Sequence, residues 1–169
     1  MSDPLPTDPR LIDRFSRVLI GAVVVVADAA GRLIFVRQPR GPFAGSWLLP
    51  GGGLEVDEDA LTGARRETLE ETGVDVKDLE FLATFEVLGN WEHGPFHFVL
   101  LAFAGHAPVD LAEHRPGENE GEMCWSQPGD LQIHPTVMMV LNQAGYTRFS
   151  PSEIEGRLHS VGLSMVRYG

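Results

Sequence analysis

The chain has 169 residues, 43 % of them hydrophobic, which suits one globular domain with an apolar core. The formal net charge of −11 disfavours binding to a nucleic-acid backbone, and no apolar run reaches the roughly 18 residues of a membrane span. A single cysteine excludes an internal disulfide and favours a reducing, cytoplasmic location. Residues 1–16 lack a long apolar run, so we expect an N-terminal arm rather than a secretory signal.

The first part of the domain predicts strands separated by turns. Residues 17–28 are apolar and β-branched, which predicts a central strand covered on both faces, and residues 32–38 predict its returning neighbour. A loop rich in Pro and Gly spans 39–45, and a short strand is expected at 46–49. The Pro-Gly-Gly-Gly run at 50–53 is expected to form a turn without regular structure.

A helix is predicted after this glycine run. Acidic residues at 57–59 favour a helix start, because carboxylates are stabilised at the positive end of the helix dipole. Gly73 is expected to end the helix after Thr72. The predicted helix is therefore short and begins soon after the glycine run.

Three glutamates share one face of this predicted helix. Glu67, Glu70 and Glu71 stand at i, i+3 and i+4, so their side chains lie close together and repel one another. A hard divalent cation, which prefers oxygen ligands, would relieve that repulsion. The alternative is a solvated acidic face; the preceding glycines and the adjacent Arg66 favour a metal site.

The rest of the chain predicts more strands and a closing helix, which together indicate a mixed sheet covered on both faces. The tail at 150–169 is expected to be a C-terminal extension, either a short helix or an oligomer contact. The other predicted elements are strands at 79–88 and 96–104 joined by a loop at 89–95, a surface loop at 109–119, a short strand at 122–126, a helical turn at 128–132 and an amphipathic helix at 136–144.

The stretch from Gly52 to Val74 resembles the signature of the Nudix hydrolases. The departures are Thr68, where an aliphatic residue is usual, and Asp57, where a glycine is common. The resemblance implies an α/β/α sandwich with a mixed sheet over residues 17–149. The residues that match the family's spacing are Gly52, Glu58, Arg66, Glu67, Leu69, Glu70, Glu71, Gly73 and Val74.

The resemblance also implies a metal site. Glu67, Glu70 and Glu71 would hold Mg²⁺, with Mn²⁺ as the second choice, and the carbonyl of Gly51 would join them. Arg66 is expected to orient a glutamate through charge-assisted hydrogen bonds. Glu70, Glu71 and Arg66 are therefore assigned to the catalytic set.

The general base is left open between a glutamate of this helix and one on a later loop. Glu118, Glu120 and Glu122 all precede Trp125, and Glu120 is our choice. The alternative is an ordinary acidic loop. Glu58 is expected to act as an acceptor at the helix end.

Three residues outside the signature are candidates for substrate binding. Arg37, at the end of the second predicted strand, would contact phosphate or base, the alternative being a surface salt bridge. Phe43 and Trp91 would stack on a nucleobase, the alternative being packing. Three histidines (93, 97, 106) do not form a zinc pattern.

The resemblance implies hydrolysis of a nucleoside diphosphate linked to another group. The favoured substrate is a small (deoxy)nucleoside triphosphate, cleaved to monophosphate and pyrophosphate. Hydrolysis of ADP-ribose, of a nucleotide sugar or of a non-nucleotide diphosphate stays open, as does a non-catalytic nucleotide sensor. We expect neither nucleic acid nor membrane as a partner, and a homodimer stays open.

Overall fold

The computed structural model describes residues 18–108, 116–118 and 120–169; the predicted N-terminal arm and most of the predicted loop at 109–119 lie outside these ranges. In chain order the elements are β1 (Val18–Ala27), β2 (Leu33–Arg37), β3 (Trp47–Leu48), β4 (Gly51–Gly53), α2 (Ala60–Thr72), β5 (Glu80–Trp91), β6 (Gly94–His106), β7 (Met123–Ser126), the 3₁₀ turn η1 (Pro128–Asp130), α3 (Pro135–Gln143), α4 (Pro151–Ser160) and β8 (Leu163–Tyr168).

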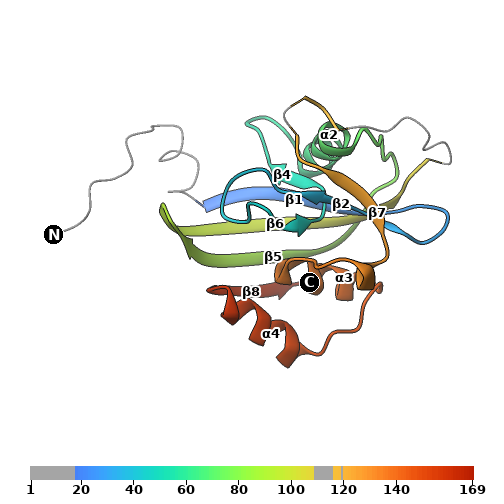
Figure 1. Cartoon of the computed structure of the whole chain (residues 1–169). Coiled ribbons are helices and arrows are strands. Elements are labelled where there is room, and N and C mark those ends of the chain that lie inside the picture. The colour runs from blue at the N-terminus through green and yellow to red at the C-terminus, as the bar shows by residue number, and fades with distance from the viewer. Residues whose placement is uncertain (1–17, 109–115, 119) are drawn as a thin grey trace.

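The strands form one mixed sheet. Its order is β3-β2-β1-β6-β5-β8, while β4 pairs with β1 and β7 pairs with β2. The β1–β6 pair is parallel and the other pairs are antiparallel. Helix α2 covers one face, and α3 and α4 lie on the other (Figure 1). The predicted α/β/α sandwich with a mixed sheet is confirmed.

Each face of the sheet has its own apolar core, because β1 alternates its side chains between the two faces. On the α2 face the buried residues are Ala22, Val24, Val26, Ile34, Ala64, Val74, Val76 and Phe103. On the face beneath α3 and α4 the core is larger and includes Val25, Phe35, Phe85, Val87, Met138, Leu141, Ile154, Leu158, Leu163 and Met165.

The glycines Gly51–Gly53 form strand β4, so the prediction of a turn without regular structure was wrong. A Cβ at Gly51 would lie 2.1 Å from the carbonyl oxygen of Ala22 on β1. A Cβ at Gly52 would lie 2.6 Å from both carboxylate oxygens of Glu67. Glycine is required here for close approach to the neighbouring strand and to α2, rather than for a bend.

Strands β5 and β6 continue through the segment predicted as a loop at 89–95, so that prediction was wrong as well. The hairpin is closed by Glu92 and His93, with Trp91 opposite Gly94. Gly89 is needed for packing, since a Cβ there would lie 2.3 Å from the side chain of Leu163. Pairing with β6 therefore outweighs the weak strand preference of the local sequence.

The predicted C-terminal extension forms α4 and β8. Ser150 caps α4 by accepting a hydrogen bond from the amide of Glu153, and Pro151 occupies the first helical position. The sequence did not predict β8, which pairs with β5 at the edge of the sheet. Among the described helices, none combines the length and apolarity that a bilayer crossing requires.

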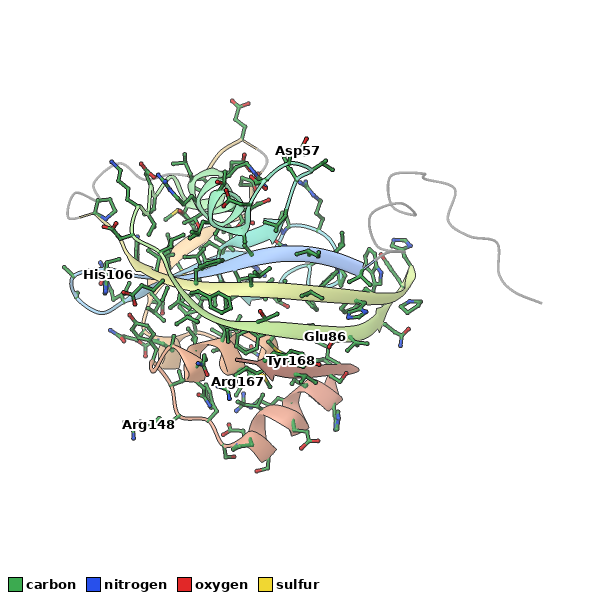
Figure 2. All side chains as sticks on the ribbon, turned by 180° about the vertical axis from the view of Figure 1, so that it is seen from behind. Asp57, Glu86, His106, Arg148, Arg167 and Tyr168 are labelled. Carbon is green, nitrogen blue, oxygen red and sulfur yellow. The ribbon has the colours of Figure 1, made fainter. Side chains whose placement is uncertain are left out.

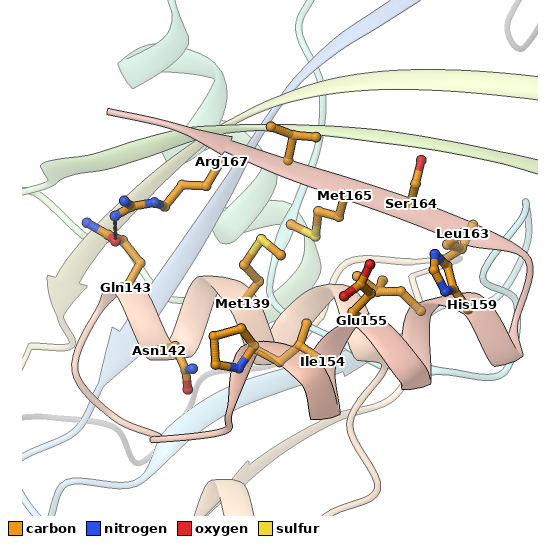
Figure 3. A pocket seen from close by; sticks show the side chains of 13 residues that line it. Met139, Asn142, Gln143, Ile154, Glu155, His159, Leu163, Ser164, Met165 and Arg167 are labelled. Atoms are coloured by element: carbon orange, nitrogen blue, oxygen red, sulfur yellow. Dashed lines mark hydrogen bonds between the residues drawn. The ribbon is translucent and has the colours of Figure 1, made fainter.

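A hollow of about 650 Å³ lies between α3, α4 and β8 (Figure 3). Met139 and Met165 contribute apolar walls, and at one end Arg167 donates a hydrogen bond to Gln143. This hollow lies on the face of the sheet opposite α2, so it is separate from the glutamates.

Candidate active site

Both ends of helix α2 are fixed by capping residues, and this fixes the position of the helix face that carries the glutamates. Asp59 is the N-cap and accepts a hydrogen bond from the amide of Thr62 at 2.9 Å. Glu58, which was expected to be an acceptor at this end of the helix, accepts from the amide of Glu55 at 2.9 Å. Gly73 ends the helix in the left-handed conformation with φ 74°, as predicted. Thr68 is buried, and its hydroxyl donates to the carbonyl of Ala64 at 2.7 Å, so this departure from the family pattern leaves no unpaired hydroxyl.

Asp57 is a second departure with a structural cost. It is the one non-glycine residue with positive φ (68°) in the part of the chain that the structure describes. Aspartate tolerates this region better than most residues, yet glycine adopts it without strain. The loop in front of α2 therefore keeps the backbone shape that a glycine would give.

Arg66 connects the loop, strand β4 and the acidic face. Its guanidinium binds Glu58 through two hydrogen bonds, with Nε to Oε1 at 2.7 Å and Nη2 to Oε2 at 2.9 Å. It also contacts Glu67 at 2.8 Å, Glu70 at 3.3 Å and the carbonyl of Gly53 at 3.1 Å. The hydrogen bonds from Arg66 hold the pKa of Glu58 at about 2, and Glu58 in turn raises the pKa of Arg66.

Glu71 is the most deeply buried carboxylate of the face, with 8 % of its surface exposed. Its Oε2 accepts a hydrogen bond from the amide of Gly51 at 2.9 Å. Burial raises the pKa of Glu71 to about 8, and the charges of Glu67, Glu120 and Glu70 add to this effect. The structure therefore shows the Gly51 amide bound to α2, whereas the sequence had suggested its carbonyl as a metal ligand.

Glu120, which lies in the chain between β6 and β7, is close enough to Glu67 and Glu71 for its charge to act on both. The amide of Gly117 donates to the carbonyl of Glu70 at 2.7 Å, which anchors this loop on α2. The charge of Glu120 raises the pKa of both Glu67 and Glu71, although burial is the larger cause for each. Of the later loop glutamates, the predicted residue Glu120 is thus placed beside the acidic face.

This donor set fits a hard divalent cation. The carboxyl group of Glu71 is buried and that of Glu67 is partly buried, and the two repel each other. Among the described residues Arg66 binds Glu67 but not Glu71, so a cation would stabilise the charged forms of both. As the side chains stand, no three Asp, Glu, His or Cys groups converge into a complete metal cage within the described residues. A ligand set of Glu67, Glu70 and Glu71 stays a prediction.

The predicted substrate residues lie outside this carboxylate cluster. Arg37 donates from Nε to the carbonyl of Gly45 at 3.1 Å and pairs with Glu122 at 3.4 Å, so it fixes the loop that follows β2. Trp91 packs against the ring of His93, with centroids 4.4 Å apart. The contacts described here join neither side chain to Glu67, Glu70 or Glu71.

Phe43 belongs to an aromatic cluster on the α3 side of the sheet. Its ring lies edge-on to Phe96 and Phe98, with centroids 5.6 and 5.9 Å away, and 4.5 Å from the ring of His134. Sequence reasoning missed His134, which caps α3 through Nδ1 and whose pKa burial lowers to about 4. Its position directly before Pro135 was the available signal, because proline favours the first helical position.

Comparison with known proteins assigns the family. The family model described as the NUDIX domain matches residues 18–143. The chain therefore belongs to the NUDIX domain family, as the sequence predicted.

Individual relatives agree with this assignment. The chain is 33 % identical over 147 residues to the oxidized purine nucleoside triphosphate hydrolase of Danio rerio, covering 83 % of this chain and 92 % of that protein. It is 48 % identical over 60 residues to the RNA pyrophosphohydrolase of Dinoroseobacter shibae, a match that spans 36 % of this chain and only 37 % of that relative's length.

A solved structure supports the fold. The NUDIX domain of Shewanella oneidensis NrtR, complexed with ADP ribose, superposes with a TM-score of 0.62 at 20 % identity, covering 82 % of this chain and 91 % of that one. At this identity the likeness concerns the fold alone.

Proposed function

We propose that this chain is a divalent-cation-dependent hydrolase of a nucleoside diphosphate linked to another group, acting in the cytoplasm. The favoured reaction cleaves a (deoxy)nucleoside triphosphate to its monophosphate and pyrophosphate. The observation that carries the proposal is the carboxylate group on α2, where the buried Glu71 and the partly buried Glu67 lie near the charge of Glu120 and beside the glycine strand β4.

Glu67, Glu70 and Glu71, with the backbone of Gly51, are the residues proposed to hold the cation. Mg²⁺ is favoured and Mn²⁺ is the second choice; either would neutralise phosphate charge and acidify a bound water. Arg66 orients the glutamates through its hydrogen bonds. Glu120 accepts the proton of the attacking water, because it lies on a loop anchored to α2.

A triphosphate substrate is favoured by the Danio rerio relative, whose match spans most of both chains. Arg37 would bind phosphate or base, and Phe43 and Trp91 would provide flat surfaces for the nucleobase. ADP-ribose or a nucleotide sugar is the second candidate, since the NrtR domain of the same fold carries ADP ribose.

A substrate panel with and without Mg²⁺ tests the proposal. The purified chain is incubated with canonical and oxidised (deoxy)nucleoside triphosphates, ADP-ribose, nucleotide sugars and dinucleoside polyphosphates. Release of pyrophosphate from a triphosphate, lost on chelation, is the expected result. If phosphate is released only from ADP-ribose, and only after phosphatase has been added, the substrate is the second candidate, ADP-ribose. Tight binding of one nucleotide without turnover of any would show a sensor instead.

A further inference from the structure

Strand β8 forms an edge of the sheet that is suited to further pairing. Among the described strands it pairs with β5 alone. It contains no proline, and its register with β5 runs without a bulge from Leu163 to Tyr168. Proline and bulges are devices that interrupt backbone pairing along an edge strand. The outer edge of β8 therefore keeps the backbone geometry that an added strand needs.

The hollow between α3, α4 and β8 runs along this edge. Five consecutive residues of β8, 163–167, line it. Successive side chains of a strand point to opposite faces of the sheet, so all five can border one hollow only where it reaches the backbone edge. The opposite wall includes Ile154 and Leu158 of α4. Strand and helix thus enclose a groove, about 13 Å long on the strand side, which we call the β8 groove.

The two ends of the β8 groove differ in charge. Arg167 lies at one end beside Gln143, whereas Glu155 lies farther along, towards the end that carries His159 (Figure 3). An acidic group is attracted by Arg167 and repelled by Glu155. A carboxylate of a bound partner therefore has one favoured position, at the Arg167 end.

Arg167 keeps its positive charge available for such a group. Its guanidinium donates to the side-chain oxygen of Gln143, whose amide donates to the carbonyl of Leu82 on β5 at 3.5 Å. Within the described residues no carboxylate pairs with Arg167, although acidic residues outnumber basic ones by 24 to 13 in the chain. The neighbouring Tyr168 points to the other face of the sheet and donates to Glu86 (Figure 2). A guanidinium that is oriented by a neutral amide can still form a charge-assisted hydrogen bond with a carboxylate.

We propose that the β8 groove binds an extended segment of a partner protein, which adds to the sheet as a strand beside β8. The backbone of the segment pairs with the edge of β8, and its alternate side chains pack between Met139, Ile154 and Met165. Methionine side chains adapt to apolar groups of different shapes. One acidic residue of the segment binds Arg167. This interaction does not depend on the proposed hydrolase activity.

The size of the β8 groove limits the length of the segment. Its volume of about 650 Å³ lies within the range of sites that bury drug-sized ligands. A strand advances by about 3.3 Å per residue, so the five residues of β8 that line the groove face about as many residues of the partner. The recognised unit is therefore a short apolar segment with one acidic residue.

Selection from a library of random hexapeptides with blocked ends, carried out on the full chain, tests this proposal. The tightest peptide is titrated into the isotope-labelled protein, and amide hydrogen exchange is measured in the free and bound states. We expect a Kd below about 1 mM, apolar residues at alternate positions and one acidic residue. The amides on the outer edge of β8 should exchange more slowly when the peptide is bound.

A double-mutant cycle tests the contact at Arg167. Arg167→Gln should weaken binding about tenfold, and so should an amide in place of the peptide's acidic side chain, because each removes the same charge-assisted hydrogen bond. The two changes together should cost no more than either alone. Arg157→Gln is the matched control, since this arginine of α4 does not line the groove, and it should bind like the wild type. The amidated peptide gives the answer even if Arg167→Gln does not fold.

The proposal is overturned if no peptide binds with a Kd below about 1 mM, or if the bound peptide leaves hydrogen exchange in β8 unchanged. Additive losses in the cycle would also contradict it, because Arg167 would then not bind the acidic residue. Slow exchange of the outer β8 amides in the free protein would overturn it as well. The edge would then be occupied by the chain itself or, if the slow exchange appears only at high protein concentration, by a second copy.

Discussion

The face of the sheet beneath α3 and α4 is closed by apolar side chains, whereas the face beneath α2 combines a smaller apolar core with a buried carboxylate, Glu71. Phe85 and Leu141 are fully buried on the first face. On the second face Glu71 is nearly as inaccessible, and burial raises its pKa to about 8. Burying a carboxyl group without an opposite charge destabilises the folded state.

This difference indicates a division of tasks between the two faces. The large core under α3 and α4 stabilises the folded state, and this stabilisation offsets the destabilisation caused by burying the carboxyl group of Glu71 on α2. Arg66 compensates part of that cost by binding Glu58, Glu67 and Glu70. Substitutions on the two faces should therefore separate activity from stability.

The largest effect is expected for Glu71→Gln. The amide oxygen of glutamine can still accept the hydrogen bond from Gly51, so the fold and the thermal midpoint should be preserved. Turnover should fall roughly 10³-fold, about 4 kcal/mol of transition-state stabilisation, measured as kcat/KM on the best substrate of the panel. Glu155→Gln on α4 is the control and should act like the wild type. Near-normal turnover in a folded Glu71→Gln protein would remove Glu71 from the metal site.

Phe85→Ala should produce the opposite result. It leaves a cavity in the core beneath α3 and should lower the free energy of unfolding by about 3–4 kcal/mol, measured by urea denaturation. kcat of the protein that remains folded should change little. Phe81→Ala, the same change at a site exposed to 55 %, should lower stability by about 1 kcal/mol or less. Equal losses for both variants would contradict the contrast between the faces.

Arg37→Ala tests whether substrate contacts extend beyond α2. If Arg37 binds substrate equally in the ground and transition states, KM should rise about tenfold while kcat changes little. Its contact with Glu122 is solvent-exposed, so stability should stay within about 1 kcal/mol of the wild type. Arg157→Ala removes a comparable surface pair on α4 and should leave KM unchanged. Unchanged kinetics in Arg37→Ala would leave Arg37 as a structural residue of its loop.

The smallest effect concerns the pH dependence of stability. Burial lowers the pKa of His134 to about 4, below the unfolded value of about 6.5, so the unfolded chain binds the proton more tightly. His134 therefore reduces stability as pH falls from about 6.5 to 4, by about 1 kcal/mol after allowance for its partial exposure. His134→Asn keeps a capping side chain for α3 and should lose this contribution, seen as a flatter pH profile of the unfolding midpoint. Parallel profiles for both proteins would contradict the assignment.

The sequence predicted those features that local chemistry determines. Gly73 ended the helix as its conformational freedom requires, and the i, i+3, i+4 spacing placed Glu67, Glu70 and Glu71 on one helix. Glu120 was chosen as the general base among three loop glutamates through the family resemblance, and that role stays a prediction. These expectations depended on a few consecutive residues or on a long motif.

The features that the sequence did not predict depend on contacts between distant residues. Gly51 and Gly89 were interpreted as turn or loop residues, whereas each permits a close approach to β1 or β8. The strand character of β8 arises from pairing with β5, and the position of His134 beside Phe43 arises from the packing of α3 on the sheet. No local pattern distinguishes a glycine that bends the chain from one that admits a neighbour.

The approach of Glu67 to Gly52 has a consequence for assigning function to related sequences. A chain that retained every glutamate of α2 but carried alanine at this position would place a methyl group where the carboxylate now lies. Such a chain would match the acidic motif, yet the carboxylate of Glu67 would have to move away from the position proposed for binding the cation. A search that scores the glutamates together with this glycine therefore selects chains in which Glu67 can keep the position that it has here.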